Sequence, residues 1–133
     1  MLYNTDNLYI GVICHDEPGG HIVINSLKKD FPNNNTDTFE VILDTYQDDR
    51  DGYIFITNPE GAKRDAQSSD EGRTNNADWD TVWDVRTQIT KDGWTAELVI
   101  PFRSLSFDET RAEQVWGINF SRRIRRRNET AYW

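Results

Sequence analysis

Apolar and polar side chains alternate with a period of two in several short segments of this chain, and this pattern limits the folds that the chain can adopt. Period two places successive side chains on opposite faces of a β-strand, whereas a helix needs apolar residues three or four positions apart. The alternation predicts strands over residues 8–16, 38–44, 53–57, 82–90, 94–100 and 115–124. Turn residues separate these segments, and only residues 101–105, which begin with a proline, have the pattern of a single helical turn.

Short strands joined by turns at nearly regular spacing predict an all-β chain folded as an antiparallel β-sandwich of the immunoglobulin or jelly-roll kind. The 133 residues are the length of one domain, so we expect residues 1–133 to form a single unit. Residues 21–31 fit either a strand or a helical turn, and the polar stretch 58–81 is expected to contain at most a short edge strand. Residues 18–20, Pro-Gly-Gly, predict a turn.

Charge divides the chain into an acidic body and a short basic end. Residues 1–113 carry 10 basic and 22 acidic side chains, whereas residues 114–133 carry five basic and one acidic. A body this acidic repels phosphate backbones and anionic lipid, which argues against nucleic acid as a partner. No apolar run approaches the ~20 residues of a spanning helix, so we expect no membrane insertion by this domain. The arginines from Arg122 to Arg127 are expected to pair with acidic neighbours in the same chain, with an anion-binding tail as the alternative.

Aromatic residues make up 12% of the chain, unlike acidic disordered chains, which are poor in them. Trp94 and Trp116 occupy inward positions of predicted strands, so both are expected in the core. Trp79 lies in a polar loop between Asp78 and Asp80. Two interpretations of Trp79 stay open: its ring stacks on a sugar whose hydroxyls bind nearby polar groups, or it folds onto the sheet as a loop anchor.

Carboxylates suggest two further kinds of site. Glu40 and Glu97 lie mid-strand between apolar neighbours, where the acid pair of a glycosidase can arise, but carboxylates on solvated strand faces are the ordinary alternative. The favoured interpretation is that the domain is not an enzyme. Asp48, Asp49 and Asp51 gather oxygen ligands of the kind that calcium prefers, although the same residues are typical of a hairpin turn. A calcium ion at this turn is the only cofactor that the residues suggest.

Several motifs, taken in order, resemble the family 9 carbohydrate-binding module. They are Asp37-x-x-Glu40, the hairpin Gly93-Trp94-x-x-Glu97 followed by Ile100-Pro101-Phe102, and Trp116-Gly117-Ile118-Asn119. The likeness covers nearly the whole chain. The sequence is most similar to the version found at the N-terminus of large secreted or outer-membrane bacterial proteins.

The resemblance implies a non-catalytic β-sandwich that binds an oligosaccharide or polysaccharide, often appended to a glycoside hydrolase and often carrying structural calcium. Glu40 matches the acidic sugar contact of the family, and Asn119 matches a polar strand position near the site. Two aromatics clamp the terminal sugar in the family: residues 33–37, where one would fall, have none here, and the other falls near or beyond Trp133.

Taken together, these features predict ligand contacts from Trp79, Glu40, Asn119 and Trp133. The resemblance further implies an N-terminal stretch that precedes the first strand in the family and is missing here. It also implies an extracellular, periplasmic or outer-membrane location, as part of a larger exported protein. The alternative function is that of a structural or protein-interaction domain that keeps the fold without binding sugar.

Overall fold

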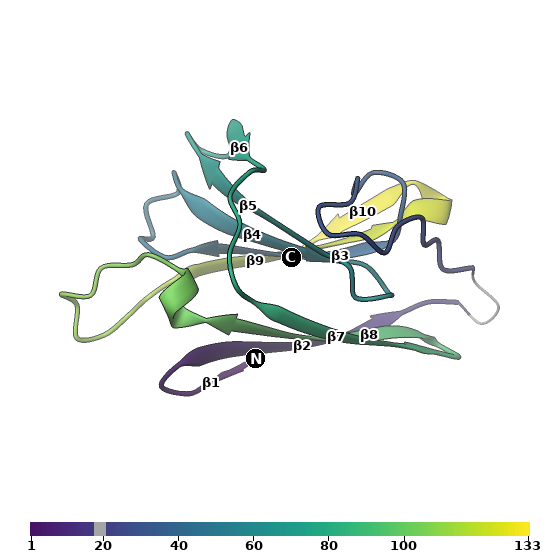
Figure 1. The fold of residues 1–133 in the computed structure, drawn as a ribbon, viewed down its shortest axis with the longest axis horizontal. Helices are drawn as coiled ribbons and strands as arrows, with labels where there is room; N and C mark the ends of the chain where they lie inside the picture. Colours follow the sequence, from purple (N-terminus) through teal and green to yellow (C-terminus); the bar gives the residue numbers. More distant parts are fainter. Residues whose placement is uncertain (18–20) are drawn as a thin grey trace.

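A computed structural model describes residues 1–17 and 21–133, whose strands form two antiparallel sheets packed face to face as a β-sandwich (Figure 1). The four-stranded sheet has the order β1 (Leu2–Tyr3), β2 (Asn7–His15), β8 (Gly93–Pro101), β7 (Asp84–Thr90). The six-stranded sheet has the order β10 (Glu129–Tyr132), β9 (Gly117–Ile124), β3 (Thr38–Asp44), β4 (Gly52–Thr57), β5 (Lys63–Ser69), β6 (Thr74–Asn76). Two single 3-10 turns, η1 (Phe102–Ser104) and η2 (Arg125–Arg127), complete the described elements.

The core lies between the two sheets and is built from alternate residues of each strand, as period two requires. From the six-stranded sheet it takes Phe39, Val41 and Leu43 of β3, which are at most 3% exposed. The facing sheet supplies Trp94 and its alternate neighbours along β8, and Trp83 lies just before β7. The all-β sandwich expected from the sequence is therefore confirmed, as is the burial of Trp94, and Trp116 is partly buried against the core.

The predicted strands agree with the observed ones to within one or two residues at each end. The hairpin between β7 and β8 turns at Gly93, whose φ of +133° suits glycine, and where a Cβ would come within 2.0 Å of the Cys14 carbonyl oxygen. The prediction for residues 58–81 is wrong, because β5 is a full strand there and β6 adds a short one. The turn expected at residues 18–20 lies outside the described residues.

Residues 21–31 were expected to form either a strand or a helical turn, but residues 21–37 form neither. They run irregularly over the outer face of the six-stranded sheet, where buried Phe31 packs with Ile56 and Ala62 in a second apolar cluster. The Asp30 N–H donates to the carbonyl of Lys63 at 2.9 Å, which fastens the segment to the start of β5. This covers one end of the outer face and leaves the rest open.

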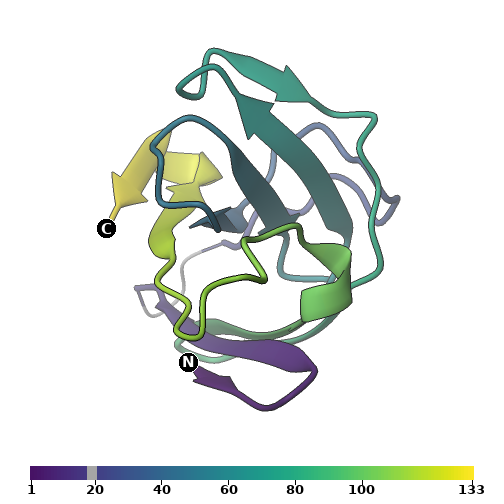
Figure 2. The same ribbon diagram turned by 90° about the vertical axis from the view of Figure 1, so that its left-hand side faces the viewer.

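The connection from β6 to β7 runs down one side of the sandwich and closes it (Figure 2). Its Thr81 N–H donates to the Asp65 carboxylate of β5 at 2.7 Å. At the C-terminal end, Arg126 pairs with Asp16 and Arg127 pairs with Glu17, so the predicted intramolecular pairing is confirmed for these two arginines of the basic run. Within residues 1–17 and 21–133, no helix has the length and apolarity needed to cross a membrane.

Candidate functional site

Glu40 lies at the middle of β3 on the outer face of the six-stranded sheet, because its neighbours Phe39 and Val41 point into the core. Across the ladder it pairs with Ser121 of β9, whose hydroxyl donates a 3.1 Å hydrogen bond to Oε1. Partial burial raises the pKa of the Glu40 carboxyl, and the Ser121 hydrogen bond offsets part of that rise. A partly buried carboxylate with so few hydrogen-bond donors destabilises the fold, and its oxygens can still accept hydrogen bonds from a ligand.

Asn119 shares this outer face with Glu40. Asn119 pairs with Ile42 of β3, two residues along the strand from Glu40, so the two side chains are diagonal neighbours about 7–8 Å apart. The Asn119 carboxamide is exposed, and its oxygen accepts the Phe120 N–H at 2.8 Å. The predicted site residues Glu40 and Asn119 are thus brought together on one surface, with an amide beside a carboxylate.

Tyr132 of β10 is a member of this surface that the sequence reasoning missed. It pairs with Ser121, which in turn pairs with Glu40, so the three side chains stand in one row across β10, β9 and β3. Two strand spacings separate Tyr132 from Glu40, about 9–10 Å. The Tyr132 side chain is 71% exposed. Period two predicts only that Tyr132 and Trp133 point to opposite faces, and the register of β10 on β9 decides that Tyr132 is the one on this face.

Trp133 lies on the opposite face of the same sheet edge. Its N–H donates to the carbonyl of Phe120 at 2.9 Å, which continues the β9–β10 ladder by one residue. Phe120 itself pairs with Val41 and points toward the core. Trp133 therefore stands at the rim of the space between the sheets, away from Glu40, and is 65% exposed.

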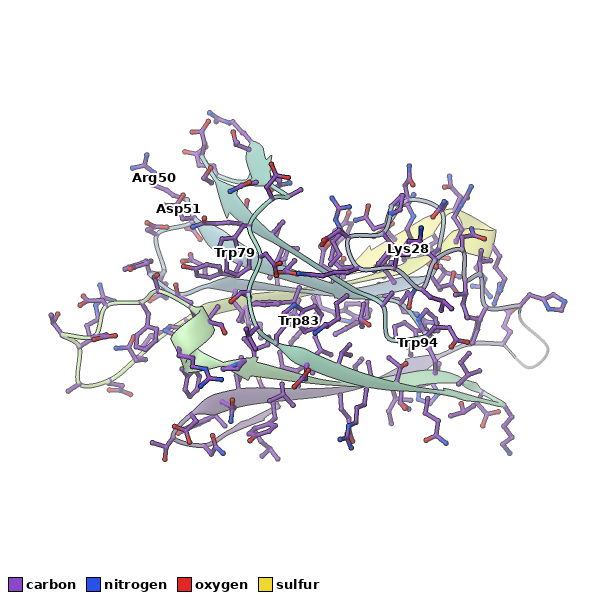
Figure 3. The ribbon with its side chains drawn as sticks, in the orientation of Figure 1. Lys28, Arg50, Asp51, Trp79, Trp83 and Trp94 are labelled. Carbon is purple, nitrogen blue, oxygen red and sulfur yellow. The ribbon has the colours of Figure 1, made fainter. Side chains whose placement is uncertain are left out.

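Trp79 packs on the inner side of the six-stranded sheet (Figure 3). Its ring centroid lies 5.0 Å from that of Tyr53 and 6.1 Å from that of Phe55, both on β4, and the ring is partly buried against the core. This packing agrees with the interpretation of Trp79 as an anchor that holds its loop against the sheet. Of the four predicted sugar contacts, the structure groups Glu40 with Asn119 and places Trp79 and Trp133 elsewhere.

We call the open part of the outer face the β3–β9–β10 surface, defined by Glu40, Ile42, Asn119, Ser121 and Tyr132. It offers the half-buried carboxylate of Glu40, which the buried Ser121 hydroxyl supports, together with one exposed amide, one exposed aromatic ring and a half-buried apolar side chain. Hydrogen-bonding groups beside an aromatic face match a ligand that has hydroxyls and an apolar C–H face. The strands hold these residues in fixed register, so the surface is preformed.

Glu97 is on β8 opposite Arg86 of β7, on the outer face of the four-stranded sheet. Glu40 is on the outer face of the other sheet, so the whole core separates the two carboxylates. Glycosidic hydrolysis needs two carboxyl groups about 5–10 Å apart on either side of one bond. Glu40 and Glu97 therefore cannot act as such a pair.

The acidic hairpin between β3 and β4 is organised by its own carboxylates. Asp44 accepts backbone N–H groups from residues 46–49 at 2.7–3.4 Å, and Asp48 accepts those of Arg50 and Asp51 at 2.9 and 3.3 Å. These amides lower the pKa of the exposed Asp48 carboxyl. The contacts are those of a turn, and calcium held by Asp48, Asp49 and Asp51 stays a prediction. In the described part of the chain, no three His, Cys, Asp or Glu residues are grouped to hold a metal.

Comparison of the chain with protein-family models, with curated proteins and with solved structures finds no match.

Proposed function

We propose that this domain is a non-catalytic carbohydrate-binding module, and that it binds a neutral oligosaccharide or a polysaccharide chain on the β3–β9–β10 surface. Tyr132 stacks on the C–H face of one pyranose, and Glu40 and Asn119 hydrogen-bond its hydroxyls. In this proposal the domain directs a larger exported protein to its glycan.

The observation that carries the proposal is the row Tyr132–Ser121–Glu40, fixed by the register of three adjacent strands. Its ends are about 9–10 Å apart, which leaves room for one sugar ring between the phenol and the carboxylate. The Ser121 hydroxyl bonded to Glu40 holds the carboxylate in place from the middle of the row. Because the contacts are few, we expect weak affinity, with Kd between about 10 µM and 1 mM.

We do not expect charge on the ligand to contribute to binding. The domain carries a net charge of −8, which disfavours acidic glycans. A neutral sugar releases no counterions on binding, so the affinity should change little with salt concentration, in contrast to the steep salt dependence of polyanion binding.

The test is isothermal titration with xylo-, cello- and manno-oligosaccharides, using Tyr132→Ala and Trp133→Ala as a matched pair. The two aromatic residues are adjacent and similarly exposed, but they point to opposite faces of the sheet. Loss of one stacking ring is worth about 1–1.5 kcal/mol, so Tyr132→Ala should weaken binding about tenfold. Trp133→Ala should leave the affinity within about twofold of the unmodified domain.

No heat with any of these sugars counts against carbohydrate binding. Equal loss in both variants, or loss in Trp133→Ala alone, counts against the β3–β9–β10 surface.

A further inference from the structure

Arg123 of β9 lies on the same outer face as the β3–β9–β10 surface, next to the residues that define it. It follows Ser121 by two residues in the strand, so the two side chains point to the same side of the sheet. The intervening Arg122 is directed to the inner side, where it lines a cleft with Phe120. Asn119 precedes Ser121 by two residues. Along β9 the surface therefore has an amide on one side of Ser121 and a guanidinium on the other.

The strand register places Arg123 beside both residues between which the sugar ring is proposed to lie. Arg123 pairs with Thr38 of β3, two residues from Glu40, and with Thr130 of β10, two residues from Tyr132. It is therefore a diagonal neighbour of Glu40 and of Tyr132, about 7–8 Å from each, a separation that a long side chain can span. A ring between the phenol and the carboxylate is thus within reach of the guanidinium.

The Arg123 side chain is held near its base. Arg123 is half-buried, and its neighbour Thr38 on β3 is buried, so Arg123 stands at the border between the covered and the open part of the outer face. Of the three guanidinium nitrogens, Nε is closed off from solvent, and the two Nη atoms are not among the enclosed atoms. A planar guanidinium held in this way loses little freedom when it donates to a ligand.

Glu40 and Arg123 have complementary hydrogen-bonding capacities that the fold does not use up. The ion pairs between described residues include neither of them. An ionised carboxylate only accepts hydrogen bonds, and a guanidinium only donates them. A sugar hydroxyl can do both, so two neighbouring hydroxyls can bridge the pair: one donates to the carboxylate and the next accepts from the guanidinium.

We propose that Arg123 is a fourth ligand contact of the β3–β9–β10 surface, and that Arg123 and Glu40 together select sugars with two neighbouring free hydroxyl groups. One hydroxyl donates to the Glu40 carboxylate, and its neighbour accepts from an Nη–H of Arg123, while Tyr132 stacks on the ring. This inference rests on the proposed function, because it concerns the same surface, and it adds the class of sugar that the surface accepts.

The first test titrates Arg123→Gln with the neutral oligosaccharide that the unmodified domain binds best. Loss of the guanidinium hydrogen bond should weaken binding about tenfold. Arg86→Gln is the matched control, because Arg86 is opposite Glu97 on the outer face of the other sheet. It should bind within about twofold of the unmodified domain, as expected for a distant site. Thermal melts verify that both variants are folded.

Deoxy analogues of the same sugar identify the two hydroxyls. Removal of either of two neighbouring hydroxyls should weaken binding to the unmodified domain about tenfold. One of these losses should disappear in Arg123→Gln and the other in Glu40→Gln, because each variant already lacks the partner of that hydroxyl. In the unmodified, isotope-labelled domain, the sugar should also shift the side-chain N–H signals of Arg123 and leave those of Arg86 in place. This last measurement does not depend on the folding of any variant.

The proposal is overturned if Arg123→Gln binds the sugar as tightly as the unmodified domain does, or if no deoxy analogue loses its effect in that variant. Both results leave the proposed function in place as long as Tyr132→Ala still weakens sugar binding. The proposal is also wrong if oligosaccharides of uronic acids bind more tightly than neutral ones through Arg123, since the guanidinium then recognises a carboxylate. Absence of binding by every neutral sugar instead removes the proposed function and this inference together.

Discussion

Replacing Trp79 by alanine separates the two interpretations that its loop position left open. Trp79 packs on Tyr53 and Phe55 of β4 and covers the side of the core that the β6–β7 connection closes. If Trp79 anchors this loop, Trp79→Ala should lower the free energy of unfolding and leave glycan affinity unchanged.

The size of the loss follows from the area that the ring covers. A packed aromatic side chain buries 150–250 Å², and partial burial of Trp79 puts it near the low end, about 150 Å². At about 25 cal/mol per Å² this is nearly 4 kcal/mol, which residual burial in the unfolded chain reduces to about 3 kcal/mol. For a domain of this length, such a loss lowers Tm by about 10–12 °C.

Urea unfolding followed by tryptophan fluorescence measures the loss, and titration with the best-binding oligosaccharide measures affinity. Trp133→Ala is the matched control, because its ring is 65% exposed, and it should cost less than about 1 kcal/mol. A Trp79→Ala variant of unchanged stability that no longer binds sugar would refute the anchor interpretation and return Trp79 to the ligand site.

Three further predictions concern titration and turn structure. Burial raises the pKa of Glu40, so ionisation of its carboxyl destabilises the fold as pH rises through the folded-state pKa. At neutral pH, Glu40→Gln should therefore be more stable than the unmodified domain. Urea titrations should show this difference vanish below about pH 4. A constant difference across pH would contradict this. Asp44→Ala removes the acceptor of four loop amides and should cost about 1–2 kcal/mol of unfolding free energy in the same assay; no change would show that the loop holds without it. Burial raises the pKa of Cys14 to about 11, so a thiol reagent at about pH 8 should label it only after denaturation, and rapid labelling of the folded domain would be inconsistent with that burial.

The predictions from sequence succeeded where side-chain alternation was strong and failed where polar strands lacked it. In β5, Asp65 is buried in a strand of mostly polar residues, and its carboxylate is satisfied by the N–H of Thr81 from the connection that crosses the sandwich. The pairing of β5 with β4 is a tertiary contact, and so is the hydrogen bond to Asp65. No local sequence pattern therefore predicts either of them. The apolar residues of the stretch 21–31 were ambiguous for the same reason, since Phe31 packs on a distant strand.

Side-chain alternation alone predicts that this protein is built from strands, which face of each strongly alternating strand enters the core, and that Trp94 is buried there. Period two decides all three, because it is a property of one strand alone. Long-range contacts between strands decide which strands are neighbours and in which register they pair. That choice puts Tyr132 in a row with Glu40 and turns Trp133 to the other face. Register belongs to pairs of strands, so the candidate sites arise only when distant segments meet.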